Sequence, residues 1–258
     1  MSRLILISIL VIAIGACATN IAGRKQIMLV SESQAISASK EAYVATLDPL
    51  EKDGKLDNDP KQVARVNQIT DKLIAQAQKL RPETRDWEWS VKVIDDPKTV
   101  NAWCMAGGKM AIYTGLIDQL EATDDEIAQV MGHEIAHALA NHSAERMSVA
   151  IASNLALAGY QSTGASQGKL ATATIAAQLA LTLPNSRTSE SEADKIGIKL
   201  AAMAGYNPRA AVTLWQKMAK VSGGGGLEFL STHPAPKNRE KKLKKMIPKM
   251  DPIYKAAR

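Results

Sequence analysis

The chain has 258 residues, which is enough for one large domain or two small ones with a substantial core. Apolar residues make up 46% and charged residues 22%, and this balance excludes a disordered or fibrous protein. The net charge of +6 is modest and no basic patch interleaved with aromatic residues is present, so no nucleic acid is expected as a partner. Aromatic residues are scarce at 4% and alanine is abundant, which favours a fold rich in closely packed helices.

The first residues predict an export signal. Arg3 precedes the apolar run Leu4 to Ile14, which is too short to span a membrane, and small residues follow it. The sequence Ile14-Gly15-Ala16-Cys17 resembles the bacterial lipobox, in which the cysteine is acylated and becomes the mature N-terminus. A plain signal peptide, or an N-terminal anchor helix with an incidental cysteine, is the alternative interpretation.

A lipid on Cys17 predicts where the protein resides. Residues 1–16 are then the signal peptide, and residues 17–30 are a lipidated tether to the membrane. The next residue is Ala18 rather than aspartate, so resemblance to such lipoproteins implies the periplasmic side of the bacterial outer membrane. Cys104 would then lack a partner for an intrachain disulfide, even in an oxidising compartment.

Two helices and two strands are predicted before the central motif. The helices run from Ser31 to Tyr43 and from about residue 60 to 80, and a loop rich in Asp, Gly and Asn separates them. From Trp87 to Val93 apolar residues recur at every second position, which predicts a half-buried strand. A second strand, Lys109 to Thr114, follows a glycine turn, and a loop lies between the two strands. That turn and loop contain Asn101, Trp103, Cys104, Gly107 and Gly108.

The second half of the chain is predicted to be helical. Thr123 and Glu126 form a capping box, so a helix is expected to begin there and to run to about Met147. Two Ala-rich stretches, 149–159 and 170–183, are each too short to cross a bilayer, which favours buried helices over a hairpin that dips into the membrane. Further helices are expected at 187–204, 208–221 and 237–248. One compact α+β domain, mostly helical and covering residues 31–258, is the simplest interpretation.

The central motif is His133-Glu134-Ile135-Ala136-His137, an H-E-x-x-H sequence inside the predicted helix. Spacing of four residues places both imidazoles on one helix face, where they can bind one metal ion. Glu134 then lies beside the metal and can act as the general base. The motif therefore predicts a hydrolytic zinc site with one Zn2+ per chain.

A third ligand is expected from a later helix. The metzincin pattern is rejected because Ala140 and Ser143 occupy the positions where it needs Gly and His. His142 is one place short of that pattern and is expected to point away from the two motif histidines. Glu190 is the candidate ligand, and Asp194, four residues later, is expected to orient His133.

Two alternatives to this ligand assignment stay open in the sequence. Glu192 is a rival ligand, although it lies on the opposite side of the helix from Glu190. The acidic segment as a whole would otherwise be a solvated helix start.

These motifs together resemble the gluzincin peptidases of the HtpX and CAAX-prenyl-protease family. Asn101-Ala102-Trp103 with Gly107-Gly108 and Gly115-Leu116 is similar to a strand and turn of that family, and Thr232-His233-Pro234 with Arg239 is similar to a later segment. The resemblance covers roughly residues 85–245 and implies a single zincin-like domain with a small β-sheet. The lipobox points to the periplasmic LoiP- and BepA-like lipoproteins. LoiP is the nearer comparison because no tetratricopeptide repeats follow.

The resemblance also implies roles for several residues outside the motif. His233 would stabilise the oxyanion or close the open metal position as a latch, and a purely structural role is the alternative. Arg187 and Arg239 would brace the site or contact substrate, with a simple salt bridge as the alternative. Asn101 and Gly108 would contact substrate. Ala106 stands where the family often has proline, and with Cys104 and Met105 this leaves the substrate contacts of that loop open.

The expected function is metal-assisted peptide hydrolysis. Polypeptide substrates would add as a strand along Lys109–Thr114, and the resemblance implies unfolded or misassembled envelope proteins. The membrane contact would be the lipid on Cys17, and the lysines from Lys241 to Lys245 either attract an anionic membrane surface or form a solvated helix face. The alternatives are an assembly factor or chaperone with a latent metal site, and a zinc amidase acting on cell wall.

Overall fold

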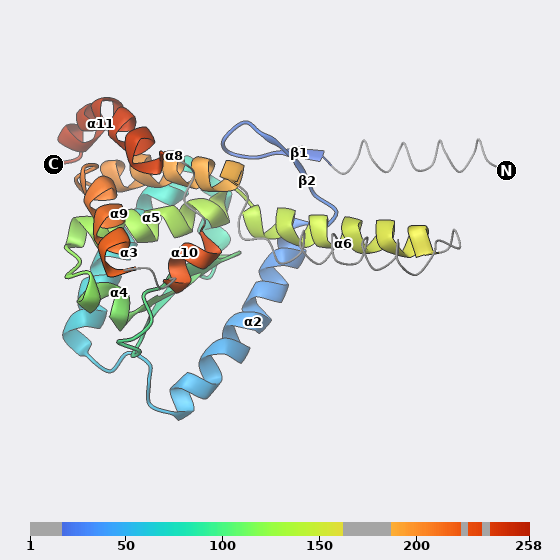
Figure 1. Cartoon of the computed structure of the whole chain (residues 1–258), viewed down its shortest axis with the longest axis horizontal. Helices are drawn as coiled ribbons and strands as arrows, with labels where there is room; N and C mark the ends of the chain where they lie inside the picture. Colours follow the sequence, from blue (N-terminus) through green and yellow to red (C-terminus); the bar gives the residue numbers. More distant parts are fainter. Residues whose placement is uncertain (1–16, 162–186, 223–226, 234–237) are drawn as a thin grey trace.

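The computed structural model describes residues 17–161, 187–222, 227–233 and 238–258 (Figure 1). The predicted signal peptide and most of its lipobox, the apolar stretch at 170–183 and Pro234 lie outside these residues. Among the described residues no helix is both long and apolar enough to cross a membrane. The predicted mostly helical α+β class is confirmed.

Helix α5 (Asp124–Leu139) is the centre of the fold. The capping box predicted from Thr123 and Glu126 is present, and every residue from Glu126 to Leu139 is buried. Helix α3 (Pro60–Leu80), which begins at the predicted position under the cap of Asp59, packs against α5, as do the later helices α8 and α9. A helix buried on all sides is held by tertiary packing rather than by an amphipathic stripe.

The sheet has three strands, and one of them was predicted to be loop. Strands β3 (Ser90–Ile94) and β5 (Lys109–Tyr113) pair in parallel, and β4 (Ala102–Met105) pairs with β5 in antiparallel register. The first strand begins at Ser90 rather than Trp87 because residues Pro82–Asp86 form a 3-10 helix, and Trp89 Nε1 donates to Thr84 O of that helix.

The strand order is β3-β5-β4, so the predicted peptide-binding edge is wrong. β5 is the central strand and its backbone is paired on both sides. Within the described sheet β3 and β4 are the edge strands; β3 also forms an isolated bridge between Ile94 and Leu56, and β4 pairs only with β5. Gly108 also has a conformational role in this sheet. Its φ is +80°, and a Cβ there would lie 2.4 Å from the ring of Trp89, so it shapes the β4–β5 turn.

The predicted helix from Thr123 to Met147 is broken after Leu139. Asn141 has a φ of 56°, and α6 (His142–Gln161) starts immediately after it. Distant donors stabilise the break: Arg81 Nη1 donates to Leu139 O and Gln26 Nε2 donates to Ala140 O, both at 2.9 Å. These bonds satisfy the carbonyls that a helix end leaves without partners. The Ala-rich stretch at 149–159 is the continuation of α6.

Helix α8 (Arg187–Met203) crosses α5 so closely that their backbones touch. A Cβ on Gly197 would lie 2.8 Å from His133 N, and one on Gly132 would lie 3.1 Å from Gly197 O. Glycine at both positions therefore sets the distance between the two helices. Three further helices complete this side of the molecule: α9 (Ala210–Val221), α10 (Glu228–Thr232) and α11 (Arg239–Ala256).

The N-terminal segment has more structure than the predicted tether. A hairpin of β1 (Cys17–Thr19) and β2 (Lys25–Ile27) lies beside α6 and α8 (Figure 1). Helix α2 (Glu32–Lys52) begins under the cap of Ser31, as predicted, but continues beyond Tyr43. It is longer because Tyr43 and Leu47 bury their side chains against the sheet.

Candidate metal centre

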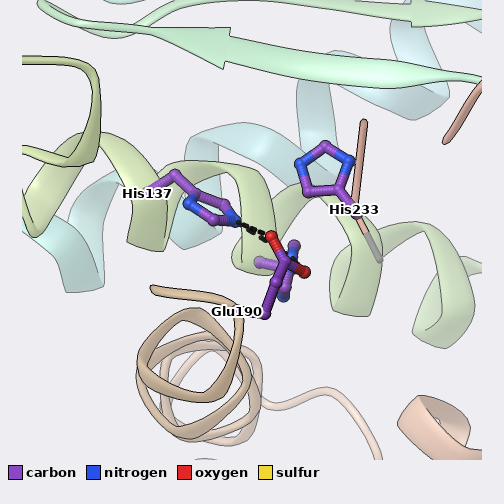
Figure 2. A group of neighbouring side chains, drawn as sticks. His137, Glu190 and His233 are labelled. Carbon is purple, nitrogen blue, oxygen red and sulfur yellow. Dashed lines mark hydrogen bonds and ion pairs between the residues drawn. The ribbon is translucent and has the colours of Figure 1, made fainter. Parts of the chain in front are cut away.

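Helices α5 and α8 bring three of the predicted ligands together. His133 and His137 project from one face of α5, and their Nε2 atoms lie 3.1 Å apart. Glu190, in the first turn of α8, is fully buried, with Oε1 3.3 Å from His137 Nε2 and Oε2 3.4 Å from His133 Nε2. Figure 2 shows the carboxylate of Glu190 pointing at the ring of His137, with His233 on the other side of it.

The donor atoms fit a small divalent cation. In a tetrahedral zinc site with bonds of about 2.0–2.1 Å, neighbouring ligand atoms lie roughly 3.3 Å apart. The three separations of 3.1, 3.3 and 3.4 Å are close to that value. Among the described residues, Glu190 Oε1 is buried without a hydrogen-bond partner. A carboxylate oxygen buried in this way destabilises the fold unless a cation binds to it. Two imidazoles and a carboxylate are the donor set typical of zinc.

Asp194 and Arg239 surround the first histidine. Asp194 Oδ1 lies 3.2 Å from His133 Nδ1, as expected for a carboxylate that orients a metal-binding imidazole. Arg239, at the start of α11, donates from Nε to Asp194 at 3.0 Å and from Nη1 to Glu190 at 3.2 Å. Its guanidinium also stacks on Trp215, 3.5 Å from the ring centroid. The predicted bracing role of Arg239 therefore has a clear geometry.

The charges of this cluster are strongly coupled. Burial opposes ionisation of Glu190, but the close approach of His133 and His137 to its carboxylate holds the pKa of Glu190 below its ordinary range. Burial likewise opposes the charged form of His133, yet Asp194 and Glu190 raise its pKa to about 9. Burial lowers the pKa of His137 well below its ordinary value. The carboxylates of Glu190 and Asp194 thus stabilise a positive charge beside His133.

Glu134 lies next to His233 and, among the described residues, lacks a hydrogen-bond partner at Oε1. This buried oxygen lies 3.4 Å from His233 Nε2. Burial raises the pKa of Glu134 to about 8, while the neighbouring His133 lowers it. A carboxylate with a raised pKa at the edge of a metal cluster is suited to accepting a proton.

His233 joins the same group from the end of α10. Its ring stacks on Phe229 at a centroid distance of 4.5 Å, and its Nδ1 lies 3.2 Å from Phe229 O. When Nδ1 donates to that carbonyl, Nε2 is left as a lone-pair donor. The ligating atoms of His133, His137, Glu190 and His233 all lie within 4.8 Å of one another. Burial, followed by the charge of His133, lowers the pKa of His233 to about 3, which keeps the ring neutral.

A groove of about 370 Å³ opens beside the cluster. Its walls come from α2, β4, α6 and α10, and its lining includes Asn101, Trp103, Cys104, Glu134, Arg146 and His233. Asn101 Nδ2 donates to Glu228 Oε1 at 3.0 Å, so this residue also holds α10 in place. Burial raises the pKa of the free Cys104 thiol well above its ordinary value. Arg187 is exposed at the first turn of α8, and the structure does not bring it into the site.

The structure gives two residues near the ligands positions that the sequence left open or predicted wrongly. His142 was expected to point away, but the break at Asn141 turns it back, and its Nδ1 lies 2.8 Å from His137 Nδ1. Glu192, considered as a rival ligand, lies 3.0 Å from His142 Nε2 instead. Burial opposes its ionisation, but the hydrogen bonds of His142, Arg24 and Asn20 lower the pKa of Glu192 to about 2. In the sequence, Asn141 immediately before His142 is the signal that could have predicted this break and the turn of His142 towards His137.

Comparison with known families agrees with this geometry. Residues 60–247 match the profile of Peptidase family M48, and this range is well over half of the chain and contains both ligand-bearing helices. The chain belongs to the M48 family. The mitochondrial metalloendopeptidase OMA1 of Saccharomyces cerevisiae is 39% identical over 175 residues, which cover 65% of this chain and 49% of the yeast protein.

Other M48-type relatives come from mitochondria and from bacteria. Human mitochondrial metalloendopeptidase OMA1 is 31% identical over 241 residues, covering 88% of this chain and 45% of that protein. Metalloprotease LoiP of Escherichia coli is 33% identical over 150 residues, covering 57% of this chain and 58% of LoiP. The chain spans less than two thirds of the length of each of these relatives. They do not single out the LoiP-like lipoproteins suggested by the sequence.

Replacing Glu190 tests the ligand set of this M48 protein. We expect the wild-type chain to carry about one zinc ion and Glu190→Ala to lose it or bind it far more weakly, because one of three protein ligands is removed. Metal content of the purified proteins by mass spectrometry measures this. Glu88→Ala, which removes an exposed carboxylate, is the control and should retain zinc. Zinc retained by Glu190→Ala would place the third ligand elsewhere.

Proposed function

We propose that this protein is a zinc metalloendopeptidase in which His133, His137 and Glu190 hold the metal and Glu134 is the general base. The observation that carries the proposal is the buried, unbonded Oε1 of Glu134 beside the ligand atoms. Membership of the M48 family supports it, as do the printed names of the metalloendopeptidase relatives. A zinc ion held here would polarise the scissile carbonyl and acidify an attacking water molecule.

The residues around the ligands have separate roles in the remaining steps of the reaction. Glu134 takes the proton of the attacking water at Oε1 and returns it to the leaving amine. Asp194 holds His133 in a fixed orientation by accepting from its Nδ1, and Arg239 in turn holds Asp194 by donating from Nε. The side chains of His133, Asp194 and Arg239 are all buried, which strengthens these interactions.

The free edge of β4 is the proposed substrate platform. Residues 101–105 line the groove, and their backbone edge has no partner within the described sheet. An extended peptide can add to such an edge by main-chain hydrogen bonds, which read backbone rather than side chains. This geometry suits unfolded polypeptides of varied sequence. It replaces the Lys109–Thr114 edge expected from the sequence.

Glu134→Gln tests the assignment of the base. We expect this variant to keep its zinc but to cleave an unfolded protein such as casein at least about 100-fold more slowly, because the amide cannot accept the proton. Cleavage followed by gel densitometry, beside metal analysis of the same sample, measures both quantities. Wild-type cleavage by the variant would remove Glu134 from the mechanism. A wild-type chain that binds zinc and casein without cutting would favour the assembly factor with a latent site.

We further propose that His233 closes the metal site as a latch. Its neutral ring presents Nε2 to the ligand group, while Nδ1 is held by the backbone carbonyl of Phe229. The α10 segment that carries it also contacts Asn101 through Glu228, so the closing residue is connected to the substrate groove. A peptide entering along β4 would meet this contact first.

His233→Ala distinguishes a latch from an oxyanion donor. For a latch we expect casein cleavage to rise several-fold with zinc content unchanged, because the ring no longer competes for the open metal position. The initial rate at saturating casein, with zinc measured on the same protein, is the readout. A rate that falls about 100-fold with zinc retained would instead assign oxyanion stabilisation. Loss of zinc and fold together would mean that the residue is structural.

We propose that the protein works at the periplasmic side of the bacterial outer membrane on unfolded or misassembled envelope proteins. The lipobox-like sequence that ends at Cys17 supports this location. A groove of about 500 Å³ between α8, α11 and the β1–β2 hairpin adds support. Its floor is apolar, and its rim carries five exposed lysines: Lys195, Lys199, Lys242, Lys245 and Lys249. In the described parts of the chain none of the five pairs with a carboxylate, so their charge is available to an anionic bilayer.

Vesicle flotation of the unlipidated chain tests the membrane face. We expect binding to vesicles with phosphatidylglycerol but not to pure phosphatidylcholine, because each lysine near an anionic surface contributes roughly 1 kcal/mol. Exchange of Lys242, Lys245 and Lys249 for glutamate should abolish flotation. The same exchange at Lys52, Lys61 and Lys98, which are exposed elsewhere, leaves the groove intact and should preserve it. If both triple variants lose flotation equally, vesicle binding depends on the net charge of the protein and not on this groove.

A further inference from the structure

A buried chain of hydrogen bonds connects the N-terminal hairpin to the metal ligand His137. The Nε2 atom of His137 faces the other ligands, and its Nδ1 lies 2.8 Å from Nδ1 of His142. On the far side of that ring, His142 Nε2 lies 3.0 Å from Glu192 Oε2. His142 is only 1% exposed, so water does not compete for these bonds.

The direction of each bond follows from the ligand role of His137. A neutral imidazole that binds a metal through Nε2 carries its proton on Nδ1. His137 Nδ1 therefore donates to His142 Nδ1, and this places the proton of His142 on Nε2. His142 Nε2 then donates to Glu192, whose carboxylate accepts it. Every donor in the chain has an acceptor, and the ligand tautomer of His137 is the one it supports.

The hairpin holds the other end of this chain. Asn20 Nδ2 donates to Glu192 Oε2 at 2.9 Å, and Arg24 Nε donates to Glu192 Oε1 at 2.5 Å. Asn20 Oδ1 accepts from the backbone N–H groups of Ala22 and Arg24, each at 3.0 Å, so the same side chain also shapes the turn. Glu192 is thus oriented by two side chains of one short turn.

A second set of contacts docks the hairpin without touching His142. Arg24 forms a bidentate pair with Glu145 on α6, at 2.6 and 2.7 Å. Gln26 donates to the same carboxylate and to Ala140 O, both at 2.9 Å. These bonds hold the hairpin against the break between α5 and α6. Glu145 is therefore a natural control, since it shares Arg24 with Glu192 but has no contact with the histidines.

We propose that His142 and Glu192 are positioning residues for the ligand His137, and that docking of the N-terminal hairpin on Glu192 sets the zinc affinity of the site. The inference rests on the proposed zinc centre and extends it. His133 receives its carboxylate directly, from Asp194 on α8. His137 is connected to the carboxylate of Glu192 through His142. The N-terminal hairpin, which lies outside the helical core, holds that carboxylate. The side-chain exposure of Arg24 is 26% and that of Glu192 is 11%, so the path runs from the surface to the ligand.

Zinc affinity and the cobalt spectrum test this positioning role. Affinity of the full chain is measured by competition with a chromophoric chelator, and the visible absorption of the cobalt(II)-substituted protein reports ligand geometry. We expect His142→Ala and Glu192→Ala to weaken zinc binding about 10- to 100-fold, the usual effect of removing partners behind a ligating histidine, and to alter the cobalt spectrum. The double change Asn20→Ala and Arg24→Ala should move both readouts in the same direction, because it releases Glu192.

Glu145→Ala separates positioning from simple docking. It removes a bidentate ion pair of Arg24 and should lower the melting temperature of the metal-free protein as much as Glu192→Ala does. We expect its zinc affinity and cobalt spectrum to match the wild type. Equal zinc affinity and spectra in Glu145→Ala, Glu192→Ala and His142→Ala would overturn the inference and leave the zinc centre standing. A wild-type chain that binds no zinc would overturn the zinc centre as well.

Discussion

The buried negative charge of α8 is the constraint on which the site depends. Glu190 and Asp194 lie one helical turn apart in the interior, where an uncompensated carboxylate would be strongly destabilising. Arg239 compensates them from α11, and its own charge is covered by the ring of Trp215 on α9. Two histidines of α5 face the same carboxylates. The packing of the C-terminal helices is therefore required by the chemistry of the centre as well as by the apolar core.

Local sequence predicted the parts of the site that a single helix determines. Spacing of four residues places His133 beside His137 and Glu190 beside Asp194, and both placements hold in the structure because each pair shares a helix face. The capping box at Thr123 was equally local. The pairing of Asp194 with His133 could be anticipated from the need of a metal-binding imidazole for a second partner.

What could not be predicted depends on residues distant in sequence. The run from Leu139 to Met147 contains no Gly or Pro that would end a helix, and the break at Asn141 is stabilised by Arg81 and Gln26, which supply donors to the end of α5. The position of His142 follows from that break. The sequence likewise predicted strands at the positions of β3 and β5 but not β4 between them in the chain, so β5, which is the interior strand, was taken for an edge. A strand pattern reveals which face is buried, whereas pairing order is decided by the whole fold.

The contact between Gly132 and Gly197 has a consequence for which ions the centre can hold. Main-chain atoms of α5 and α8 meet there without intervening side chains, one residue from His133 and three from Asp194. The close approach of these two backbones brings the imidazole pair and Glu190 near one another. Calcium is bound by about six or more oxygen ligands at roughly 2.3–2.6 Å in a flexible coordination geometry. Two imidazole nitrogens and one carboxylate fit that requirement poorly, whereas they match the donor set typical of zinc.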